Sequence, residues 1–142
     1  MAESVPWLLV GLGNPGGRYA DNRHNVGFMV ARSFCDLFSP PPSWTERFKG
    51  LTAAVREGAL RCVALCPQTY MNRSGAAVRC LVELFAVAPV DLLVIYDEVQ
   101  LPLGRLRLRA AGSPGGHRGM ESVVEALQTQ ELPRLRLGIM RR

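Results

Sequence analysis

The sequence holds few of the residues from which metal centres are built. It has only two histidines, His24 and His117, so a histidine-rich metal site is excluded. The cysteines are Cys35, Cys62, Cys66 and Cys80. The middle two stand in an apolar stretch at a spacing that fits neither a zinc motif nor a thioredoxin motif. We therefore expect no metal and four buried, reduced thiols, and any histidine chemistry has to use His24 or His117.

Long apolar runs and targeting segments are also lacking. No apolar run reaches the about 20 residues that a bilayer-spanning helix needs. Residues 1–6 have neither the basic segment nor the apolar core of a secretory signal, and they are too short and too acidic for a transit peptide. We expect a cytoplasmic protein without a membrane partner, or alternatively a protein of an organelle matrix. With 142 residues and 48% hydrophobic residues, the chain suffices for one folded domain.

Lysine is almost absent, because Lys49 is the only one and arginine supplies the rest of the positive charge. Residues 105–142 carry eight arginines against three glutamates, so the excess that gives the net charge of +5 lies there. An arginine fork matches the geometry of a phosphate group, which favours a nucleic-acid partner. A solvated arginine-rich face gives the same composition, so charge alone does not decide between the two.

Apolar strands alternate with amphipathic helices along the chain. Strands are predicted at 7–10, 51–55, 61–65, 92–96, 105–109 and 135–140, and helices begin near residues 22, 72 and 118. The second and third strands form a hairpin that turns near Glu57. This order predicts a single three-layer α/β domain over residues 1–142, with a mixed, mostly parallel central sheet flanked by helices.

Apolar spacing also predicts which sides of these elements face the core. The inner face of the first helix would carry Val26, Met29, Val30, Phe34 and Leu37. In the strand at 105–109, leucines and arginines alternate strictly, which predicts a half-exposed strand with leucines on one face and arginines on the other.

A glycine-rich turn follows the first strand. Residues 11–16 satisfy the G-x-G-x-x-G spacing, so a dinucleotide site is one interpretation. Pro15 has no backbone N–H to offer a pyrophosphate, and the next helix begins several residues later. Gly17 and Arg18 stand where a P-loop needs Lys followed by Ser or Thr. We interpret the segment as a tight turn that puts Asn14 at the carboxyl end of a strand.

Polar residues at strand ends and helix starts supply groups suited to hydrolysis. His24 opens the first helix, where the helix dipole disfavours the imidazolium and leaves a neutral base. Asp97 follows the strand 92–96 and can accept a hydrogen bond from His24. Asn72 and the loop 115–119 offer donors for an oxyanion or another anion. Water is the expected nucleophile, although each residue could equally serve as a helix or turn cap.

Taken together, these segments resemble the bacterial-type peptidyl-tRNA hydrolase family. The matching blocks are Gly11–Gly16 with Tyr19 and Arg23–Gly27, Pro67–Gly75, Tyr96–Glu98 with Leu101–Gly104, Gly115–Gly119, and Leu135–Ile139. They follow in order and spacing from Trp7 to Ile139. The resemblance implies an enzyme that hydrolyses the ester between peptide and tRNA in peptidyl-tRNA, and so recycles tRNA from stalled or dropped-off translation products. It implies no metal or organic cofactor, and we expect a monomer.

The resemblance also implies a role for each site residue. His24 would take a proton from water, and Asp97 would support His24 in that role. Asn14 would contact the substrate near its amide and distinguish peptidyl-tRNA from aminoacyl-tRNA, while Asn72 would hold the substrate carbonyl or the attacking water. The substrate-binding residues would be Tyr19, Tyr70, Met71, Asn72, Gly116 and Arg118.

The chain departs from the family pattern in two places. Many members have asparagine where this chain has Arg118, and an arginine there is able to pair with a phosphate. Members usually continue past the position of Arg142 through a helical segment that covers the sheet. We therefore expect the C-terminal helical segment to be missing and apolar surface to be exposed on the final strand and the first helix.

The alternative function is that of a non-catalytic RNA-binding relative on the same scaffold. The presence of His24 and Asp97 favours the enzyme over this alternative.

Overall fold

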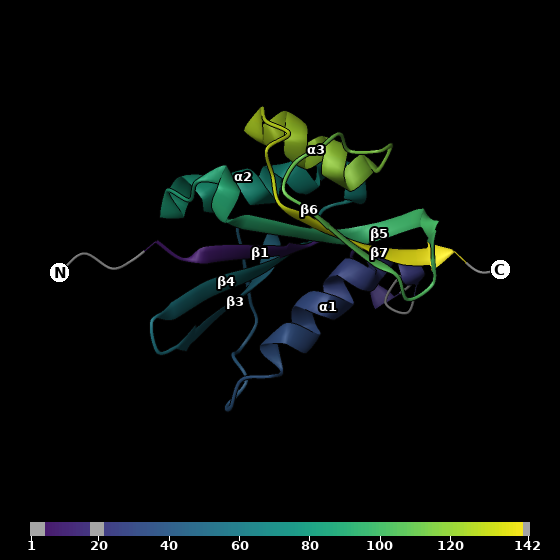
Figure 1. The fold of residues 1–142 in the computed structure, drawn as a ribbon. Helices are drawn as coiled ribbons and strands as arrows, with labels where there is room; N and C mark the ends of the chain where they lie inside the picture. Colours follow the sequence, from purple (N-terminus) through teal and green to yellow (C-terminus); the bar gives the residue numbers. More distant parts are fainter. Residues whose placement is uncertain (1–4, 18–21, 141–142) are drawn as a thin grey trace.

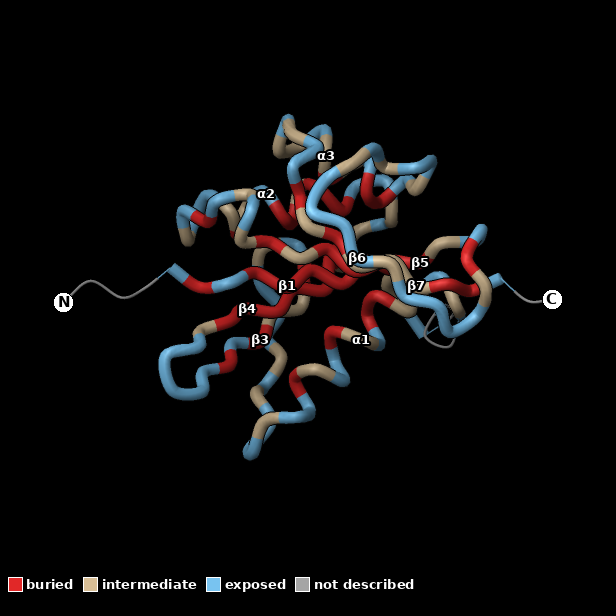
Figure 2. Tube along the Cα trace, viewed as in Figure 1, coloured by how far each residue is buried: buried red, intermediate tan, exposed pale blue. Residues whose placement is uncertain are grey.

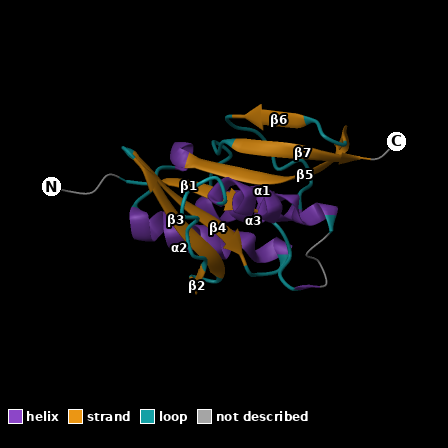
Figure 3. Ribbon diagram, turned by 90° about the horizontal axis from the view of Figure 1, so that it is seen from below, coloured by secondary structure: helices purple, strands orange, loops and turns teal. Residues whose placement is uncertain are grey.

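The computed structural model describes residues 5–17 and 22–140 of the chain. These residues form a seven-stranded mixed sheet with the strand order β2-β3-β4-β1-β5-β7-β6. The strands are β1 (Trp7–Gly11), β2 (Thr45–Arg47), β3 (Gly50–Glu57), β4 (Leu60–Pro67), β5 (Leu92–Pro102), β6 (Leu106–Arg109) and β7 (Arg134–Met140). The central strands β4, β1, β5 and β7 run parallel, whereas the pairs at both edges are antiparallel (Figure 3). The predicted mixed sheet is confirmed.

Within the described ranges, three α-helices cover the sheet: α1 (Val26–Cys35), α2 (Ser74–Phe85) and α3 (Arg118–Leu127). Figure 1 shows α1 on one face of the sheet, with α2 and α3 on the other. Ala86 ends α2 in the left-handed conformation, and Pro89 then opens the 3₁₀ turn η4 (Pro89–Asp91). The three-layer arrangement predicted from the alternation of strands and helices is therefore confirmed. No helix in the described part of the chain is long and apolar enough to cross a bilayer.

Alternate residues of each central strand point into two separate apolar layers, one on each face of the sheet. Leu8 and Val10 of β1 pack under α2 and α3, whereas Leu9 points to the opposite face and joins Cys35 of α1. The same alternation holds in β4, where Leu65 faces α2 and its neighbour Ala64 does not. Burial is accordingly concentrated along the central strands (Figure 2).

The thiols are free, and most are buried as predicted. Cys35, Cys62 and Cys66 are buried, while Cys80 on α2 is only half-buried, which corrects the prediction for that residue. Burial raises the pKa of Cys62 to about 11 and that of Cys66 to about 12. Both thiols therefore stay protonated near neutral pH and serve as small apolar groups of the core.

Strand β5 is longer than the sequence predicted. The strand was expected to end at Tyr96, but it continues to Pro102, because Asp97 and Glu98 pair with Leu137 and Gly138 of β7. A side chain at position 138 would lie 2.0 Å from the carbonyl oxygen of Pro102, so glycine is needed there for the two strands to meet. Asp97 is thus held by a central strand rather than by a loop.

The predicted inner face of α1 was wrong in part. The buried residues are Gly27, Phe28, Ala31 and Cys35, whereas Met29 and Leu37 are exposed. The helix packs so closely on β1 that small residues line the contact: a Cβ on Gly11 would lie 2.1 Å from the carbonyl oxygen of Gly27. Size, and not hydrophobicity alone, therefore selects the buried face.

Apolar side chains lie exposed at the β6 edge of the sheet. Leu106 and Leu108 of β6 are 65% and 62% exposed, and they lie directly opposite the half-buried Leu137 and Leu135 of β7. The alternation predicted a strand exposed on one face only, and this prediction is wrong in part: Leu106, Leu108 and Arg109 are exposed, and only Arg107 is half-buried. The expected exposure of apolar surface is found on β6 and at Leu37 more than on β7.

Candidate active site

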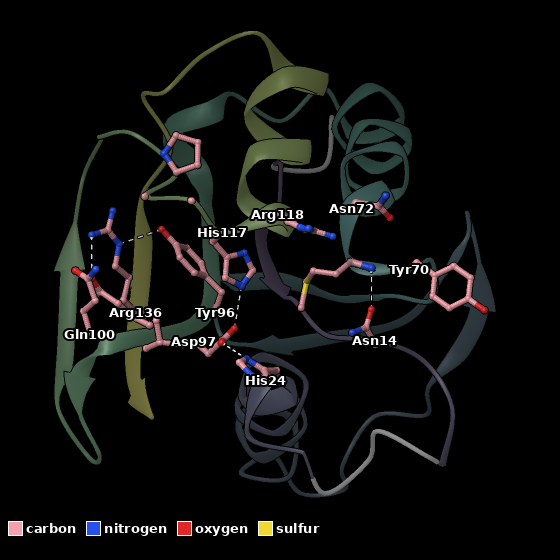
Figure 4. A pocket seen from close by; sticks show the side chains of 16 residues that line it. Asn14, His24, Tyr70, Asn72, Tyr96, Asp97, Gln100, His117, Arg118 and Arg136 are labelled. Carbon is pink, nitrogen blue, oxygen red and sulfur yellow. Dashed lines mark hydrogen bonds and ion pairs between the residues drawn. The ribbon is translucent and has the colours of Figure 1, made fainter. Parts of the chain in front are cut away.

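A cavity of about 770 Å³ opens where β5, the turn after β1 and the start of α3 meet. Its lining residues are Asn14, His24, Tyr70, Met71, Asn72, Tyr96, Asp97, Glu98, Val99, Gln100, Pro114, Gly115, Gly116, His117, Arg118 and Arg136. In the close view, His24, Asp97 and His117 form one group, and Asn14, Tyr70 and Asn72 form another across the pocket (Figure 4). Eight of the nine predicted site residues line this cavity, while Tyr19 falls outside the described residues.

His24 stands in the 3₁₀ turn η2 (Arg23–Asn25), which leads directly into α1. Asn22 caps the turn, because its side-chain oxygen accepts from the backbone N–H of His24 at 2.9 Å. The ring Nδ1 of His24 donates to Oδ2 of Asp97 at 2.5 Å. Its Nε2 has no hydrogen-bond partner among the residues described, and in the neutral ring with Nδ1 as the donor this nitrogen carries the free lone pair.

Asp97 is the buried charge of the site. Its side chain is 4% exposed, and each carboxylate oxygen accepts from a different histidine: Oδ2 from His24 and Oδ1 from His117 at 2.8 Å. Burial raises the pKa of Asp97, but the hydrogen bonds from His117 and His24 outweigh burial and lower it below its ordinary value. Asp97 is therefore ionised near neutral pH and acts only as an acceptor.

The orientation of Asn14 is fixed by its neighbours. The side-chain oxygen of Asn14 accepts from the backbone N–H of Met71 at 2.8 Å, so its NH₂ group has to point away from that contact. The buried Asn25 clamps the Asn14 backbone, accepting from its N–H and donating to its carbonyl, both at 2.9 Å. Asn14 consequently has its NH₂ donors left for a ligand in the cavity that it lines.

The second block enters the cavity through the 3₁₀ turn η3 (Met71–Arg73). Tyr70 and Asn72 are exposed there, and Met71 is partly buried against the core. The buried Ser74 closes the turn, because its hydroxyl donates to the carbonyl of Met71 at 2.8 Å. Asn72 has no hydrogen-bond partner in the described part of the chain, so its amide is available to a ligand.

The glycine loop 115–119 also reaches this cavity. Gly115 and Gly116 adopt positive φ values of 63° and 82°, which glycine alone adopts without strain. His117 then caps α3, and Arg118 is the exposed first residue of that helix. Arg118 makes no hydrogen bond or ion pair with any other described residue, so its guanidinium is free to meet an anion.

Several lining residues were not predicted from the sequence. Tyr96, Glu98, Gln100 and Arg136 lie on β5 and β7, and Nε of Arg136 donates to the Tyr96 hydroxyl at 3.0 Å. Glu98 and Gln100 follow the apolar run of β5, and their polarity was a usable signal. That change from apolar to polar residues was interpreted as the end of the strand. The role of Asn25 was also missed, although it directly follows His24.

Among the described residues, no group of three or more His, Cys, Asp or Glu side chains gathers to hold a metal ion.

The sequence matches the peptidyl-tRNA hydrolase family over residues 8–142. It is 48% identical over 132 residues to a peptidyl-tRNA hydrolase of Synechococcus sp. (strain JA-3-3Ab), covering 93% of this chain and 59% of that protein. It is 46% identical over 142 residues to that of Synechococcus elongatus, covering 98% of this chain and 67% of that protein. The chain thus spans 59% to 67% of the length of these two relatives.

A solved structure shows the same fold. The crystal structure of peptidyl-tRNA hydrolase from Acinetobacter baumannii superposes with a TM-score of 0.90 at 33% sequence identity, covering 100% of this chain and 72% of that one. The family match, the curated relatives and the shared fold agree with one another. The chain therefore belongs to the peptidyl-tRNA hydrolase family.

Proposed function

We propose that this chain hydrolyses the ester bond between peptide and tRNA in peptidyl-tRNA, with His24 as the general base. The free Nε2 of His24 is the strongest support for this proposal. Because Nδ1 donates to the ionised Asp97, the lone pair of the neutral ring lies on Nε2, and His24 lines the cavity, so Nε2 is available to accept a proton from water. No covalent bond between enzyme and substrate is needed, since an ester is already activated toward attack by water.

The reaction would proceed in two steps. Nε2 of His24 takes a proton from water while the water oxygen bonds to the ester carbonyl carbon, which leaves a negative charge on the carbonyl oxygen. Asp97 stabilises the imidazolium that forms. The intermediate then collapses, the bond to the ribose oxygen breaks, and that oxygen takes the proton from His24. The products are tRNA and the free peptide acid, which releases its remaining proton to solvent and becomes the carboxylate.

Amide donors that line the same cavity as the base suit the developing oxyanion. The NH₂ group of Asn14 faces the cavity, and Asn72 supplies a second amide. A single donor to an oxyanion contributes about 2.7–4 kcal/mol to transition-state stabilisation. We assign Asn14 to contact with the substrate amide or carbonyl and Asn72 to the carbonyl or the attacking water.

The remaining cavity residues would bind the two halves of the substrate. Tyr70 and Met71, with Tyr19, would line the groove for the tRNA end and peptide, and Gly116 would allow close approach of the ligand. Arg118 would pair with a phosphate of the tRNA.

We further propose that the protein acts as a monomer in the cytoplasm, without a metal or organic cofactor.

The test is cleavage of an N-acetylated aminoacyl-tRNA by the chain and by His24→Ala. We expect His24→Ala to lower turnover by about 10²- to 10⁴-fold, the usual contribution of a positioned base, with an unchanged circular dichroism spectrum. Arg79→Ala, on the exposed side of α2, is the control for a surface change. Near-native turnover by His24→Ala would sink the proposed mechanism.

A further inference from the structure

We propose that His117 is a positioning residue for hydrolysis: it holds the Asp97 carboxylate in the rotation at which its second oxygen meets Nδ1 of His24. This inference rests on the proposed role of His24 as general base. It assigns to His117 a task beyond shaping the glycine loop, and it excludes His117 as a second base.

The hydrogen bonds of His117 define its tautomer. The backbone N–H of Met120 donates to Nδ1 of His117 at 3.1 Å, so Nδ1 carries no proton. The opposite nitrogen, Nε2, lies 2.8 Å from Oδ1 of the ionised Asp97 and therefore donates its proton there. His117 is thus neutral, with both nitrogens engaged, and neither nitrogen is free to accept a proton from substrate or water.

The position of the ring is fixed from several sides. As the N-cap residue of α3, His117 is bound to the first turn of that helix through Met120. Its ring packs against Tyr96 with a centroid separation of 4.6 Å, and its side chain is only 13% exposed. The Nε2 proton consequently has a defined direction, toward Oδ1 of Asp97.

Asp97 needs such a second contact because a carboxylate rotates easily about its terminal bond. His24 engages only Oδ2, and the His24 side chain is 54% exposed, so it is a poor anchor for the carboxylate. With Oδ1 bound to His117, the plane of the carboxylate is determined by two contacts on opposite oxygens. The start of α3 thereby sets the orientation of His24 through Asp97.

Two substitutions separate the helix cap from the contact with Asp97. Asparagine places its side-chain oxygen near the position of Nδ1, so His117→Asn keeps the cap on α3 but does not reach Asp97. Glutamine extends to about the position of Nε2, so His117→Gln donates to Asp97 but caps poorly. If the role of His117 is purely structural, activity should depend on the helix cap. If His117 positions Asp97, activity should depend on the contact with Asp97.

The expected results are opposite for the two variants. His117→Asn should keep its Tm and lose kcat by about 10- to 100-fold, the range seen when partners that orient metal-binding histidines are removed, with KM little changed. His117→Gln should have the lower Tm and recover most of the lost kcat. Full activity of His117→Asn, or loss of kcat in proportion to Tm in both variants, would overturn the proposal.

A spectroscopic measurement tests the same inference without turnover. The hydrogen-bonded Nδ1 proton of His24 should give a low-field NMR resonance, assigned by its disappearance in His24→Ala. We expect this resonance to persist in His117→Gln and to broaden or vanish in His117→Asn. An unchanged resonance in His117→Asn refutes the positioning role. A wild-type chain without hydrolysis refutes the proposed function alone, since the resonance still decides the role of His117.

Discussion

At the scale of single residues, hydrogen-bond direction determines what each polar group of the site offers a substrate. Asn14 offers its NH₂ group as donor, because its side-chain oxygen already accepts from the backbone N–H of Met71. Asp97 can only accept, because it is ionised. Neutral His24 keeps one free acceptor, its Nε2. The cavity therefore combines one proton acceptor with an amide donor, which is the polarity required for attack of water on a carbonyl group.

The protonation of Asp97 leads to a prediction about stability and pH. Its pKa is lowered in the folded state, by His117 and His24 against the effect of burial. The stabilisation from ionised Asp97 is therefore fully present above the pKa of an unfolded aspartate, about 3.9, and it is lost as pH falls through the lowered folded value. We expect the unfolding free energy of the wild type, measured by urea denaturation, to fall steadily below about pH 4.

Asp97→Asn tests the origin of that decrease. The variant lacks the titrating group that faces both histidines, so its stability should be lower near neutral pH and should change less between about pH 5 and 3. Glu57→Gln, at the exposed end of β3, controls for the loss of an acidic group. If Asp97→Asn and the wild type gave parallel pH curves, the lowered pKa of Asp97 would be the wrong explanation.

At the scale of elements, the closeness of α1 to the sheet places the base. His24 precedes α1 by one short turn, so any shift of the helix moves the ring relative to Asp97 on β5. Gly27 is at the closest approach: a Cβ there would lie 2.4 Å from the carbonyl oxygen of Ile95 and 2.5 Å from backbone atoms of Leu12. Backbone atoms cannot yield as a flexible side chain does, so the helix itself would have to move.

We therefore expect Gly27→Ala to disturb both stability and catalysis. Overpacking of this kind destabilises by about 1–3 kcal/mol, measured by thermal or urea unfolding, and turnover should fall because His24 is displaced. Gly17→Ala is a matched control, since a Cβ at Gly17 meets nothing within 4 Å. A Gly27→Ala variant with wild-type stability would show that the contact of α1 with β5 is looser than the structure indicates.

The sequence predicted elements and motifs better than it predicted contacts. The hairpin, the helix starts and the segments that carry Asn14, His24 and Asn72 follow from local apolar spacing and glycine turns. The end of β5 did not, because the pairing of Asp97 with β7 is supplied by residues about 40 positions away, beyond the reach of local spacing. The contact of Asp97 with His24 was predicted, but its second contact, with His117, was hidden for the same reason.

At the scale of the whole molecule, the exposed leucines of β6 are an unfavourable part of the surface. Leu106 and Leu108 are two residues apart on one face of an edge strand, and Leu137 and Leu135 extend the apolar stripe across β7. Contiguous apolar patches favour association with other surfaces, and an edge strand adds unpaired backbone groups that can template pairing with another chain. We infer that this stripe governs the solubility of the chain as it stands.

Replacing both leucines should therefore improve solution behaviour without harming the site. Threonine keeps strand propensity while reducing apolar surface, so Leu106→Thr with Leu108→Thr should lower light scattering and raise the concentration at which the protein stays monodisperse. Neither residue lines the cavity, so peptidyl-tRNA cleavage per folded molecule should stay the same. Leu60→Thr changes an exposed leucine at the start of β4 and controls for hydrophobicity alone, because Leu60 does not belong to the stripe. Equal gains from Leu60→Thr and from the double variant would assign the aggregation to overall surface hydrophobicity rather than to the β6 edge.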